Sequence, residues 1–367
     1  MAGSGFGTNF RITTWGETHG AGVGVVVDGC PAGLPLERED VQKYLDRRKP
    51  GQSKYTTPRT EADRVEILSG VFEGHTTGTP ISMIVRNENQ HSKDYSDIAR
   101  CYRPGHADYC FDAKYGFRDY RGGGRSSARE TIGRVAAGAI AAKLLKEMGI
   151  SILTYTKSIG PVTIDPCHFD ATQISQNPVA MPDAHAAKEA QTFLDCCIAQ
   201  QDSSGGIIEC VITGVPAGIG DPVFDKLDAS LAKAIFSIGA VKGFEIGDGF
   251  SAARSQGSVN NDAFTTDAAG HITKATNHAG GILGGMSDSS EIIFRAAIKP
   301  TPSISRTQHT VTREGEPIDI QIKGRHDPII VPRAVVVVQS MAALVLIDAL
   351  MQNMTARVDY LRDFYKN

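Results

Sequence analysis

The sequence predicts an α/β protein whose helices and sheets form one large domain built from two quasi-repeated halves. The chain has 367 residues, 41% of them hydrophobic, which is enough for a sizeable core. Strand-like and helix-like segments follow one another through most of the chain. A strand, a Gly-X-Pro-Ala-Gly turn and a charged amphipathic helix occur twice, with matching stretches at 25–34 and 210–219. We therefore expect halves of about 6–149 and 150–352 within a single domain spanning 1–367.

In the first half, short apolar runs predict strands and a charged amphipathic run predicts a helix. The expected strands are Phe10–Trp15, Val23–Val27, Val65–Glu73 and Ile81–Arg86, and the expected helix is Glu37–Arg47. The polar segment 87–120 has no sustained period, and loops of this length in a compact domain are usually functional. An Ala-rich helix should then run from Ile132 to Met148 and stop at Gly149.

The second half repeats this alternation. The expected strands are Ile150–Tyr155, Val241–Asp248, Ile292–Ile298 and Ile318–Ile322, and the expected helices are Ala184–Ala199, Phe224–Phe236 and Pro332–Met351. The last helix begins with proline at a favoured position and is apolar nearly all round, so it should be buried in the core or at a subunit interface. The polar, Gly-rich segment 250–278 is a second candidate active-site loop.

The stretch RGGGRSSARETIGR, residues 121–134, predicts an anion-binding site. Its glycines free the backbone, and Ser127 with Glu130 has the pattern of a capping box at a helix start. The positive end of a helix and guanidinium groups both favour a phosphate or carboxylate. The arginines at this end are Arg121, Arg125, Arg129 and Arg134. The alternative is an ordinary capped helix with solvated arginines, but four clustered arginines repel one another unless an anion lies among them.

Two histidines and one aspartate are the candidate catalytic residues. His19 and His106 lie in glycine-containing loops, where an imidazole could act as a general acid near neutral pH. A structural histidine is the alternative in each case, and their spacing does not favour zinc or another metal. Asp327 follows Arg325 and His326 at a strand end, where it could be a base or an orienting partner, or a charge-paired turn residue.

Seven motifs occur in a fixed order along the chain. They are GETHG (16–20), RRKPGQS (47–53), YRPGHADY (102–109), YRGGGRSSARET (120–131), NHAGGILGG (277–285), KPTPSIS (299–305) and GRHDP (324–328). This pattern resembles the chorismate synthase family from about Phe6 to Gln352. The resemblance implies a lyase at the last step of the shikimate pathway of aromatic amino acid biosynthesis, which converts 5-enolpyruvylshikimate 3-phosphate to chorismate and phosphate by anti-1,4 elimination. It also implies an α+β sandwich with internal duplication, a homotetramer, and dependence on reduced FMN without net redox change.

The resemblance implies roles for individual residues. His19 would be the acid that meets the departing phosphate, His106 would donate to the reduced flavin near N1, and Asp327 would assist proton removal near N5. The expected flavin-binding residues are Arg125, Ser126, Ser127, Gly239, Ala240, Gly284, Lys299, Pro300, Thr301, Pro302, Ser303 and Arg325. The positions expected to bind substrate or NADP are Arg48 and Lys54, to which we add Arg103, Arg129 and Arg134.

Four residues depart from the usual family pattern. Thr18 replaces a serine, which keeps the hydroxyl but stiffens χ1. Lys54 stands where arginine is common, which exchanges a bidentate fork for a point charge. Ile329 follows GRHDP where cysteine is frequent, with no chemical consequence. Gly239 stands where asparagine is usual, so the flavin contact expected there loses the asparagine side chain.

Composition limits the partners. The net charge of -3 argues against a general nucleic-acid or membrane-binding surface. No apolar run is expected to reach the roughly 20 residues of a membrane span, and the N-terminus has no signal-peptide core. Seven cysteines without a CxxC pair fit a reducing cytoplasm.

The source of the reduced flavin is a separate question. We expect an external flavin reductase, with NADPH as an indirect reductant. The alternatives are an enzyme that reduces its own FMN with NADPH and, outside catalysis, an anion-binding module.

Overall fold

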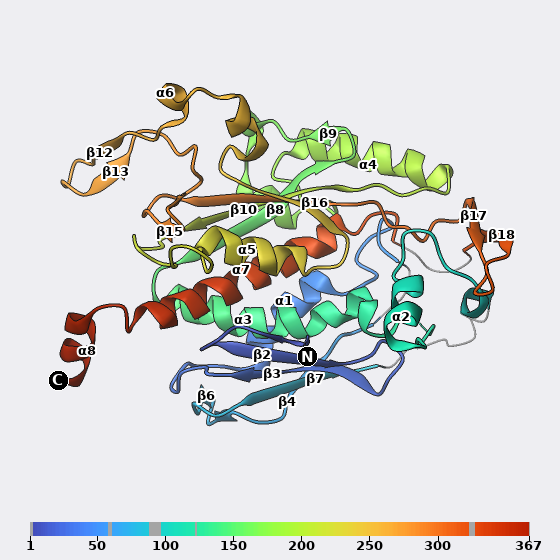
Figure 1. The fold of residues 1–367 in the computed structure, drawn as a ribbon, viewed down its shortest axis with the longest axis horizontal. Coiled ribbons are helices and arrows are strands. Elements are labelled where there is room, and N and C mark those ends of the chain that lie inside the picture. The colour runs from blue at the N-terminus through green and yellow to red at the C-terminus, as the bar shows by residue number, and fades with distance from the viewer. Residues whose placement is uncertain (1–2, 58–60, 88–96, 122, 323–326, 367) are drawn as a thin grey trace.

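The computed structural model describes residues 3–57, 61–87, 97–121, 123–322 and 327–366, and Figure 1 shows a layer of helices between two sheets. The first sheet has the order β1 (Gly5–Phe6), β2 (Arg11–Gly16), β3 (Gly22–Asp28), β7 (Ile81–Arg86), β4 (Val65–Ile67). The second has the order β11 (Val241–Ile246), β16 (Ile292–Ile298), β10 (Gly206–Thr213), β8 (Ser151–Ile159), β9 (Val162–Thr163). Every pairing in both sheets is antiparallel. The predicted α/β class is confirmed.

The middle layer consists of α1 (Arg38–Arg48), α3 (Thr131–Glu147), α5 (Leu227–Phe236) and α7 (Val331–Asn353). The strands turn alternate side chains toward this layer, as the period of a strand requires. Val23, Val25 and Val27 of β3 are almost completely buried, and so are Ile292 and Phe294 of β16. The core therefore lies on both sides of the helices.

Helix α7 corrects one expectation from the sequence. By length and composition it is the one helix among the described residues that could cross a membrane, whereas no run of that kind was expected. In the structure, 78% of its most apolar window is buried inside the protein, against α3, α5 and the second sheet. A helix enclosed on all sides needs apolar residues all round, so its composition is explained by its place in the core.

A glycine lets α3 and α7 approach closely. A Cβ atom at Gly138 would lie 2.2 Å from Cβ and 2.6 Å from Cα of Ser340 on α7. The second of these is a backbone atom in the middle of a buried helix, so it cannot move aside without shifting α7.

We expect Gly138→Ala to lower the free energy of unfolding by about 1–3 kcal/mol, because it overpacks this helix contact. Urea unfolding monitored by circular dichroism measures the change. Gly257→Ala is the control, since a Cβ there meets nothing within 4 Å. Equal stability of Gly138→Ala and the wild type would show that the two helices can separate without cost.

The two halves have matching connectivity. The first sheet contains the order β2-β3-β7-β4 and the second the order β8-β10-β16-β11. In both, the first, second, fourth and third of these strands along the chain lie side by side in that order. After β3 the chain enters α1 and after β10 it enters α5, while β7 and β16 are followed by α3 and α7. Strands and helices at corresponding places in the chain thus occupy corresponding places in the two sheets and in the layer between them.

The two Gly-X-Pro-Ala-Gly turns also form the same hydrogen bonds. Thr76 Oγ1 donates to the carbonyl of Pro31 at 2.6 Å and accepts from the backbone of Leu34 at 3.0 Å. Ser287 Oγ donates to the carbonyl of Pro216 at 2.5 Å and accepts from the backbone of Ile219 at 2.9 Å. Each hydroxyl comes from a short hairpin, β5 (Val71–Phe72) with β6 (His75–Thr76), or β14 (Ile282–Leu283) with β15 (Met286–Ser287).

Most expected elements are confirmed within two residues, and five regions differ. The helix expected at Phe224–Phe236 begins only at Leu227 in α5, after a turn in which Val223 has a φ of 71°. The expected strand Val65–Glu73 divides into β4 and β5, because the chain bends at Ser69 and Gly70, where Gly70 has a φ of 82°. The strand expected at Ile150–Tyr155 continues to Ile159 in β8. The segment 87–120 contains the helix α2 (Asp108–Tyr115). Residues 250–278 fold into the short helix α6 (Gly257–Asn260) and the hairpin β12 (Phe264–Thr266) with β13 (Ile272–Lys274), at the end of the molecule away from α2 (Figure 1).

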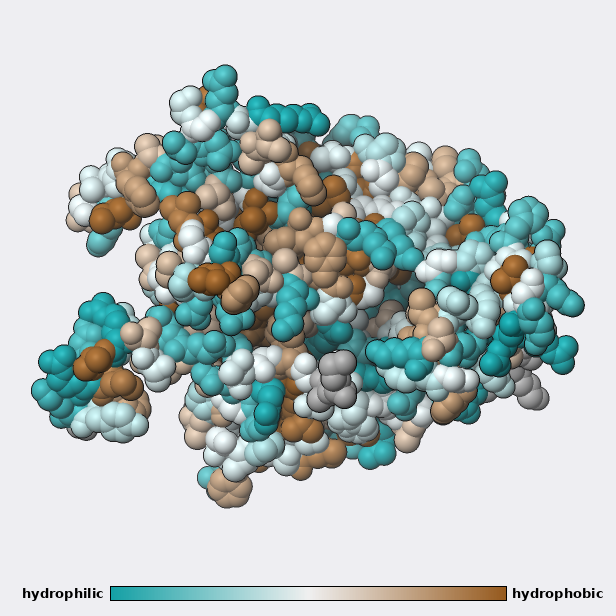
Figure 2. Space-filling model, viewed as in Figure 1, coloured by the Kyte–Doolittle hydropathy of each residue, from teal (hydrophilic) through white to brown (hydrophobic). Residues whose placement is uncertain are grey.

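The remaining elements lie at the periphery. Helix α4 (Ala184–Ala199) is near β9, and the hairpin β17 (Thr307–Val311) with β18 (Pro317–Gln321) lies near α2 (Figure 1). The C-terminal helix α8 (Val358–Tyr365), which was not expected, stands off from the body of the molecule in Figures 1 and 2. Its large side chains, including Phe364 and Tyr365, are exposed.

Candidate active site

The directions of the strands and helices bring most of the predicted site residues to one end of the layers. Strand β2 leads into the loop that contains His19, and β16 leads into Lys299, both at the end where α2 lies (Figure 1). Helices α3 and α7 begin at this end and α1 finishes there. The contacts described below connect these segments into one site.

His106 lies against the KPTPSIS segment. Its Nε2 is 2.8 Å from Ser303 Oγ, and its Nδ1 is 3.2 Å from the carbonyl oxygen of Pro104. A carbonyl oxygen can only accept, so Nδ1 bears the proton of the neutral ring and Nε2 accepts from the hydroxyl of Ser303. Lys299 Nζ donates to the carbonyl of Gly105 at 2.7 Å, and the backbone of Lys299 donates to the carbonyl of Ala240 at 2.9 Å. The structure therefore brings His106, Lys299, Ser303 and the Gly239–Ala240 turn together.

The surroundings of His106 disfavour its charged form. Burial lowers the pKa of the imidazole from 6.5 to about 4, with the positive charges of Arg103 and Lys299 adding to the effect. The expectation that this ring titrates near neutral pH is therefore wrong for the protein without ligands. It would hold a second proton at neutral pH only if a bound anion offset the desolvation.

We expect His106 to titrate near pH 4 in the free protein, followed by its ring resonances in NMR spectra assigned with His106→Asn. The unfolded chain binds the extra proton from pH 6.5 downward, so between about pH 4 and 6.5 stability should rise with pH. Saturation with a phosphorylated ligand should raise the pKa, because the ligand supplies negative charge. A pKa of 6.5 in the free protein would show that the ring is solvated.

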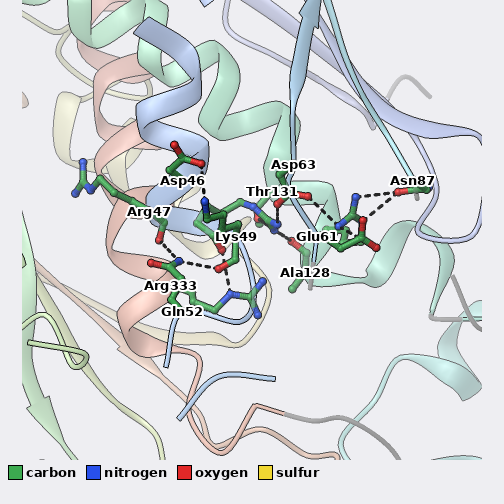
Figure 3. A network of polar contacts seen from close by, with 12 residues as sticks. Asp46, Arg47, Lys49, Gln52, Glu61, Asp63, Asn87, Ala128, Thr131 and Arg333 are labelled. Carbon is green, nitrogen blue, oxygen red and sulfur yellow. Dashed lines mark hydrogen bonds and ion pairs between the residues drawn. The ribbon is translucent and has the colours of Figure 1, made fainter. Parts of the chain in front are cut away.

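A buried network connects the RRKPGQS motif to the helix start (Figure 3). Arg48 forms an ion pair with Asp63, and Nη1 of Arg129 contacts the other oxygen of the same carboxylate at 3.0 Å. Asn87 Oδ1 accepts from Nη2 of Arg129 at 2.9 Å, and Glu61 lies 3.9 Å from Nη1. Arg48 Nη1 also donates to the carbonyl of Ala128 at 3.3 Å. Two predicted anion-binding arginines thus lie side by side, sharing one carboxylate that the sequence did not single out.

Asp327 is fixed by two donors. Its Oδ1 accepts from the backbone N–H of Thr57 at 2.7 Å, and its Oδ2 pairs with Nη1 of Arg333 at 2.7 Å. Thr57 belongs to the loop after α1 and Arg333 to the first turn of α7. The carboxylate is therefore held between the two segments that also position Arg48.

The GETHG loop is fastened to the Gly-rich loop. The hydroxyl of Thr18 donates to the carbonyl of Gly124 at 3.3 Å, so the hydroxyl that replaces serine does form a hydrogen bond. His19 is 9% exposed. Hydrogen bonds from Arg121 lower the pKa of Asp119, and His19 adds a smaller electrostatic effect, which places the imidazole near that carboxylate.

The helix start departs in detail from the capping box. Ser127 caps a 3-10 turn, accepting from the backbone of Arg129, and the α-helix begins four residues later at Thr131. Glu130 does not reach back to the cap but pairs with Arg134 at 2.8 Å and accepts from the hydroxyl of Thr14 at 3.1 Å. Ser126 donates to the carbonyl of Gly123 within the Gly-rich loop.

The argument that the four arginines need an anion to lie together is wrong. Asp119 pairs with Arg121, Asp63 with Arg129 and Glu130 with Arg134, so acidic groups of the chain itself compensate three of the four. Arg125 differs, because it donates to the hydroxyl of Thr14 at 2.8 Å and to backbone carbonyls, while Glu130 lies 3.9 Å away. Among the predicted cations that the structure describes, Arg125 and Lys299 have the least compensation, since Arg125 lies 3.9 Å from its nearest carboxylate and Lys299 pairs with none of the described carboxylates.

The other predicted arginines and Lys54 have protein partners as well. Arg103 forms a buried bidentate pair with Asp108 at 2.7 and 2.8 Å. Arg134 reaches Ser237 at 2.5 Å and so connects α3 to the Gly239–Ala240 turn. Lys54 is exposed and pairs with Asp195 of α4 at 2.8 Å. Binding of substrate or NADP by these residues remains a prediction.

Gly284 does not join this site within the chain. It lies in the turn between β14 and β15, which packs against the start of β16, whereas Lys299 follows the end of that strand. The seven residues of β16 span about 20 Å, and the hairpin and Lys299 lie toward opposite ends of this strand. Gly284 has a φ of 61° and serves the hairpin turn, which accounts for the glycine without a ligand. Arg325, the remaining expected flavin-binding residue, lies outside the described residues.

Several residues of the site were not identified from the sequence. Ser203 Oγ donates to the carbonyl of Thr301 at 2.7 Å, and the backbone of Ser204 donates to the carbonyl of Pro328 at 3.0 Å. These residues at the start of β10 therefore support both the KPTPSIS and the GRHDP segments. The run SSGG before a strand was the available signal, whereas Asp63, Asn87 and Arg333 have no local pattern that distinguishes them.

Comparison with known proteins decides the family. The family model described as chorismate synthase matches residues 10–351. The chain belongs to the chorismate synthase family. It is 68% identical over 366 residues to chorismate synthase from Agathobacter rectalis, covering 100% of both chains. It is 55% identical over 358 residues to chorismate synthase from Methanosarcina mazei, covering 96% of this chain and 97% of that one.

The fold agrees with this assignment. A crystal structure of chorismate synthase superimposes with a TM-score of 0.76 at 30% sequence identity, covering 98% of this chain and 97% of that chain. As a member of the chorismate synthase family, the chain is a lyase of aromatic amino acid biosynthesis. The described residues of the motifs that suggested this family lie, apart from NHAGGILGG, at the end of the molecule described above.

Proposed function

We propose that this lyase converts 5-enolpyruvylshikimate 3-phosphate to chorismate and phosphate by anti-1,4 elimination, and that the reaction depends on reduced FMN. The observation that supports this proposal is the convergence of two histidines, one aspartate and several cations at one end of the layers. The substrate has one phosphate and two carboxylates, which need several cations. In this proposal Arg125, Lys299 and the pair Arg48 and Arg129 supply them.

The same end has features that fit a flavin. The hydroxyl of Thr301 is buried and has no hydrogen-bond partner among the described residues, so a bound group could satisfy it. A Cβ at Gly239 would meet nothing within 4 Å, which leaves the turn open to a ligand. The residues that would hold FMN here are Arg125, Ser126, Ser127, Gly239, Ala240, Lys299–Ser303 and Arg325. When bound, reduced FMN supplies an electron-rich ring that assists the elimination and is recovered unchanged.

The chain's own residues have separable tasks in this proposal. His19 gives a proton to the departing phosphate as the C–O bond breaks. Asp327 assists removal of the C6 proton, since each of its oxygens keeps a lone pair beyond the bonds to Thr57 and Arg333. Without ligands His106 donates only from Nδ1, and its Nε2 becomes a donor as well when bound negative charge raises its pKa. The cations orient the phosphate and carboxylates so that the phosphate leaves toward His19 from one face of the ring and the C6 proton is removed on the side of Asp327 from the other.

The proposal includes the setting of the enzyme. We propose a homotetramer of single-domain subunits, each with two duplicated halves, in the cytoplasm and without a nucleic-acid or membrane partner. The matching strand orders and the matching turn hydrogen bonds support the duplication. An external flavin reductase would supply reduced FMN, with NADPH as the indirect reductant. Light scattering of the purified protein measures the oligomeric state.

An anaerobic assay tests the reaction. Purified protein, 5-enolpyruvylshikimate 3-phosphate and dithionite-reduced FMN are mixed, and chorismate absorbance is followed together with released phosphate. A second mixture contains oxidised FMN and NADPH in place of dithionite. We expect equal amounts of chorismate and phosphate in the first mixture and neither in the second. Product in both would mean that the protein reduces its own FMN, and product in neither would overturn the proposed function.

A further inference from the structure

Arg333 makes two hydrogen bonds that point in different directions. It lies in the first turn of α7, directly after Pro332, and its side chain is 12% exposed. Its Nη1 contacts Oδ2 of Asp327 at 2.7 Å, and its Nε donates to the backbone carbonyl of Arg48 at 3.0 Å. A guanidinium group is planar and its N–H directions are fixed, so one side chain sets the positions of both partners.

Each partner belongs to a different part of the proposed site. Asp327 is the carboxylate that assists proton removal, and its other oxygen is held by the backbone of Thr57 at 2.7 Å. Arg48 is a predicted substrate-binding cation, and through Asp63 it contacts Arg129 (Figure 3). The Nε atom of Arg48 is buried without a partner among the described residues, so this side chain retains a donor. Arg333 therefore lies between the carboxylate and the cations.

We propose that Arg333 is a positioning residue that couples Asp327 to Arg48. It orients the proton-removing carboxylate through its charge and fixes the anion-binding arginine through its backbone, without touching the substrate itself. This inference rests on the proposed function, because kcat here is the rate of chorismate formation. The contacts of Arg333 with Asp327 and Arg48 do not depend on that proposal. The alternative is a purely structural ion pair at the start of α7. Its loss would destabilise the fold but would not displace Asp327 or Arg48.

The two contacts predict separate effects of Arg333→Gln. Loss of the bond to Asp327 should lower kcat by about tenfold to 100-fold, because a displaced group loses its alignment with the reacting atom. Loss of the bond to Arg48 should raise the substrate Kd, measured by calorimetry with oxidised FMN so that no turnover occurs. In an Asp327→Asn background, Arg333→Gln should change kcat by less than about twofold and still raise Kd, because only the second contact remains to be lost.

Arg333→Lys separates the contacts in another way. The ammonium of lysine has its three donors on one atom and lacks the fixed fork of a guanidinium, so we expect it to keep the contact with the carboxylate, the stronger acceptor, and to give up the backbone carbonyl. We expect this variant to recover kcat relative to Arg333→Gln while its Kd stays raised. If Arg333→Gln does not fold, Arg333→Lys still decides the matter, since a wild-type Kd in that variant would overturn the coupling to Arg48.

Arg295 provides a matched control. It too donates to a carboxylate and a backbone carbonyl, Glu209 at 2.6 Å and Gly247 at 2.7 Å, but on the second sheet away from the site. Arg295→Gln should lower the melting temperature without changing kcat or Kd. If Arg333→Gln lowers kcat by the same factor with and without Asp327→Asn, the positioning role of Arg333 is overturned and the proposed function is not affected. Absence of chorismate from the wild type would overturn the proposed function, while the Kd measurements would still test the contact with Arg48.

Discussion

Replacing Asp63 with alanine is expected to lower the free energy of unfolding by about 3–5 kcal/mol, because the change leaves uncompensated charges inside the protein. Asp63 is the carboxylate shared by Arg48 and Arg129, and the exposed fractions of the three side chains are 0%, 2% and 6%. Glu61 lies farther from Arg129, at 3.9 Å, so it replaces only part of the lost charge. Urea unfolding at pH 7 measures the loss. Asp195→Ala, which removes the partner of exposed Lys54, should cause no measurable change.

The same carboxylate should contribute to acid sensitivity. Burial alone would raise the pKa of Asp63, but the charges of Arg48 and Arg129 outweigh it and hold the pKa below the ordinary 3.8. The contribution to stability is therefore complete above pH 3.8 and is lost as the pH falls through the lower folded value. An unchanged stability of Asp63→Ala at pH 7 would mean that the two arginines turn toward solvent when the carboxylate is absent.

Substitution of either candidate histidine is expected to abolish most turnover. His19→Ala and His106→Ala should each lower kcat by roughly 10²–10⁴-fold, the usual contribution of a positioned proton donor. Both proteins should still bind oxidised FMN, since Arg125, Lys299 and the Gly239–Ala240 turn remain. The anaerobic chorismate assay measures turnover, and quenching of flavin fluorescence measures binding.

A third histidine supplies the control for this pair. His309 is on the exposed hairpin β17–β18, where it pairs with Asp319. His309→Ala should turn over at the wild-type rate, which separates a general effect of removing an imidazole from an effect at the site. Wild-type rates in both His19→Ala and His106→Ala would remove these residues from the proposed mechanism.

The fold was predictable from the sequence wherever the spacing of apolar residues and the residues that begin and end an element agree. The helix 184–199 is found at the same residues in α4, and β16 occupies the predicted 292–298, because each has a clear apolar period and recognisable ends. Helix α2 was missed because it is short and polar, with Asp108 buried against Arg103 in place of an apolar face. Its formation depends on tertiary contacts that no local pattern reveals.

The site was predictable as a set of residues and only in part as a geometry. The motifs identified His19, His106, Asp327 and most of the cations, and the structure gathers them at one end. The acidic partners that compensate those cations come from distant parts of the chain, so their effect could not be read locally. Asp63 contacts both Arg48 and Arg129 from a backbone with a φ of 44°. The residues on either side of Asp63 in the sequence do not predict this left-handed conformation. The glycines around Gly284 show a related limit, since a hairpin turn and a ligand loop demand the same residue, so the sequence alone does not separate the two.

The assembly of the site from both halves has a consequence for the stability of the protein when ligands are bound. His19 and Asp327 are more than 300 residues apart in the sequence, and Arg134 joins the α3 start to Ser237 across the two halves. A ligand that contacts groups from both halves binds only when both are folded against each other, so it acts as a reversible cross-link. At 100 times its dissociation constant such a ligand stabilises the folded state by about 2.7 kcal/mol. Occupancy by metabolites would thus protect the enzyme from proteolysis, and its lifetime in the cell would follow the supply of its own ligands.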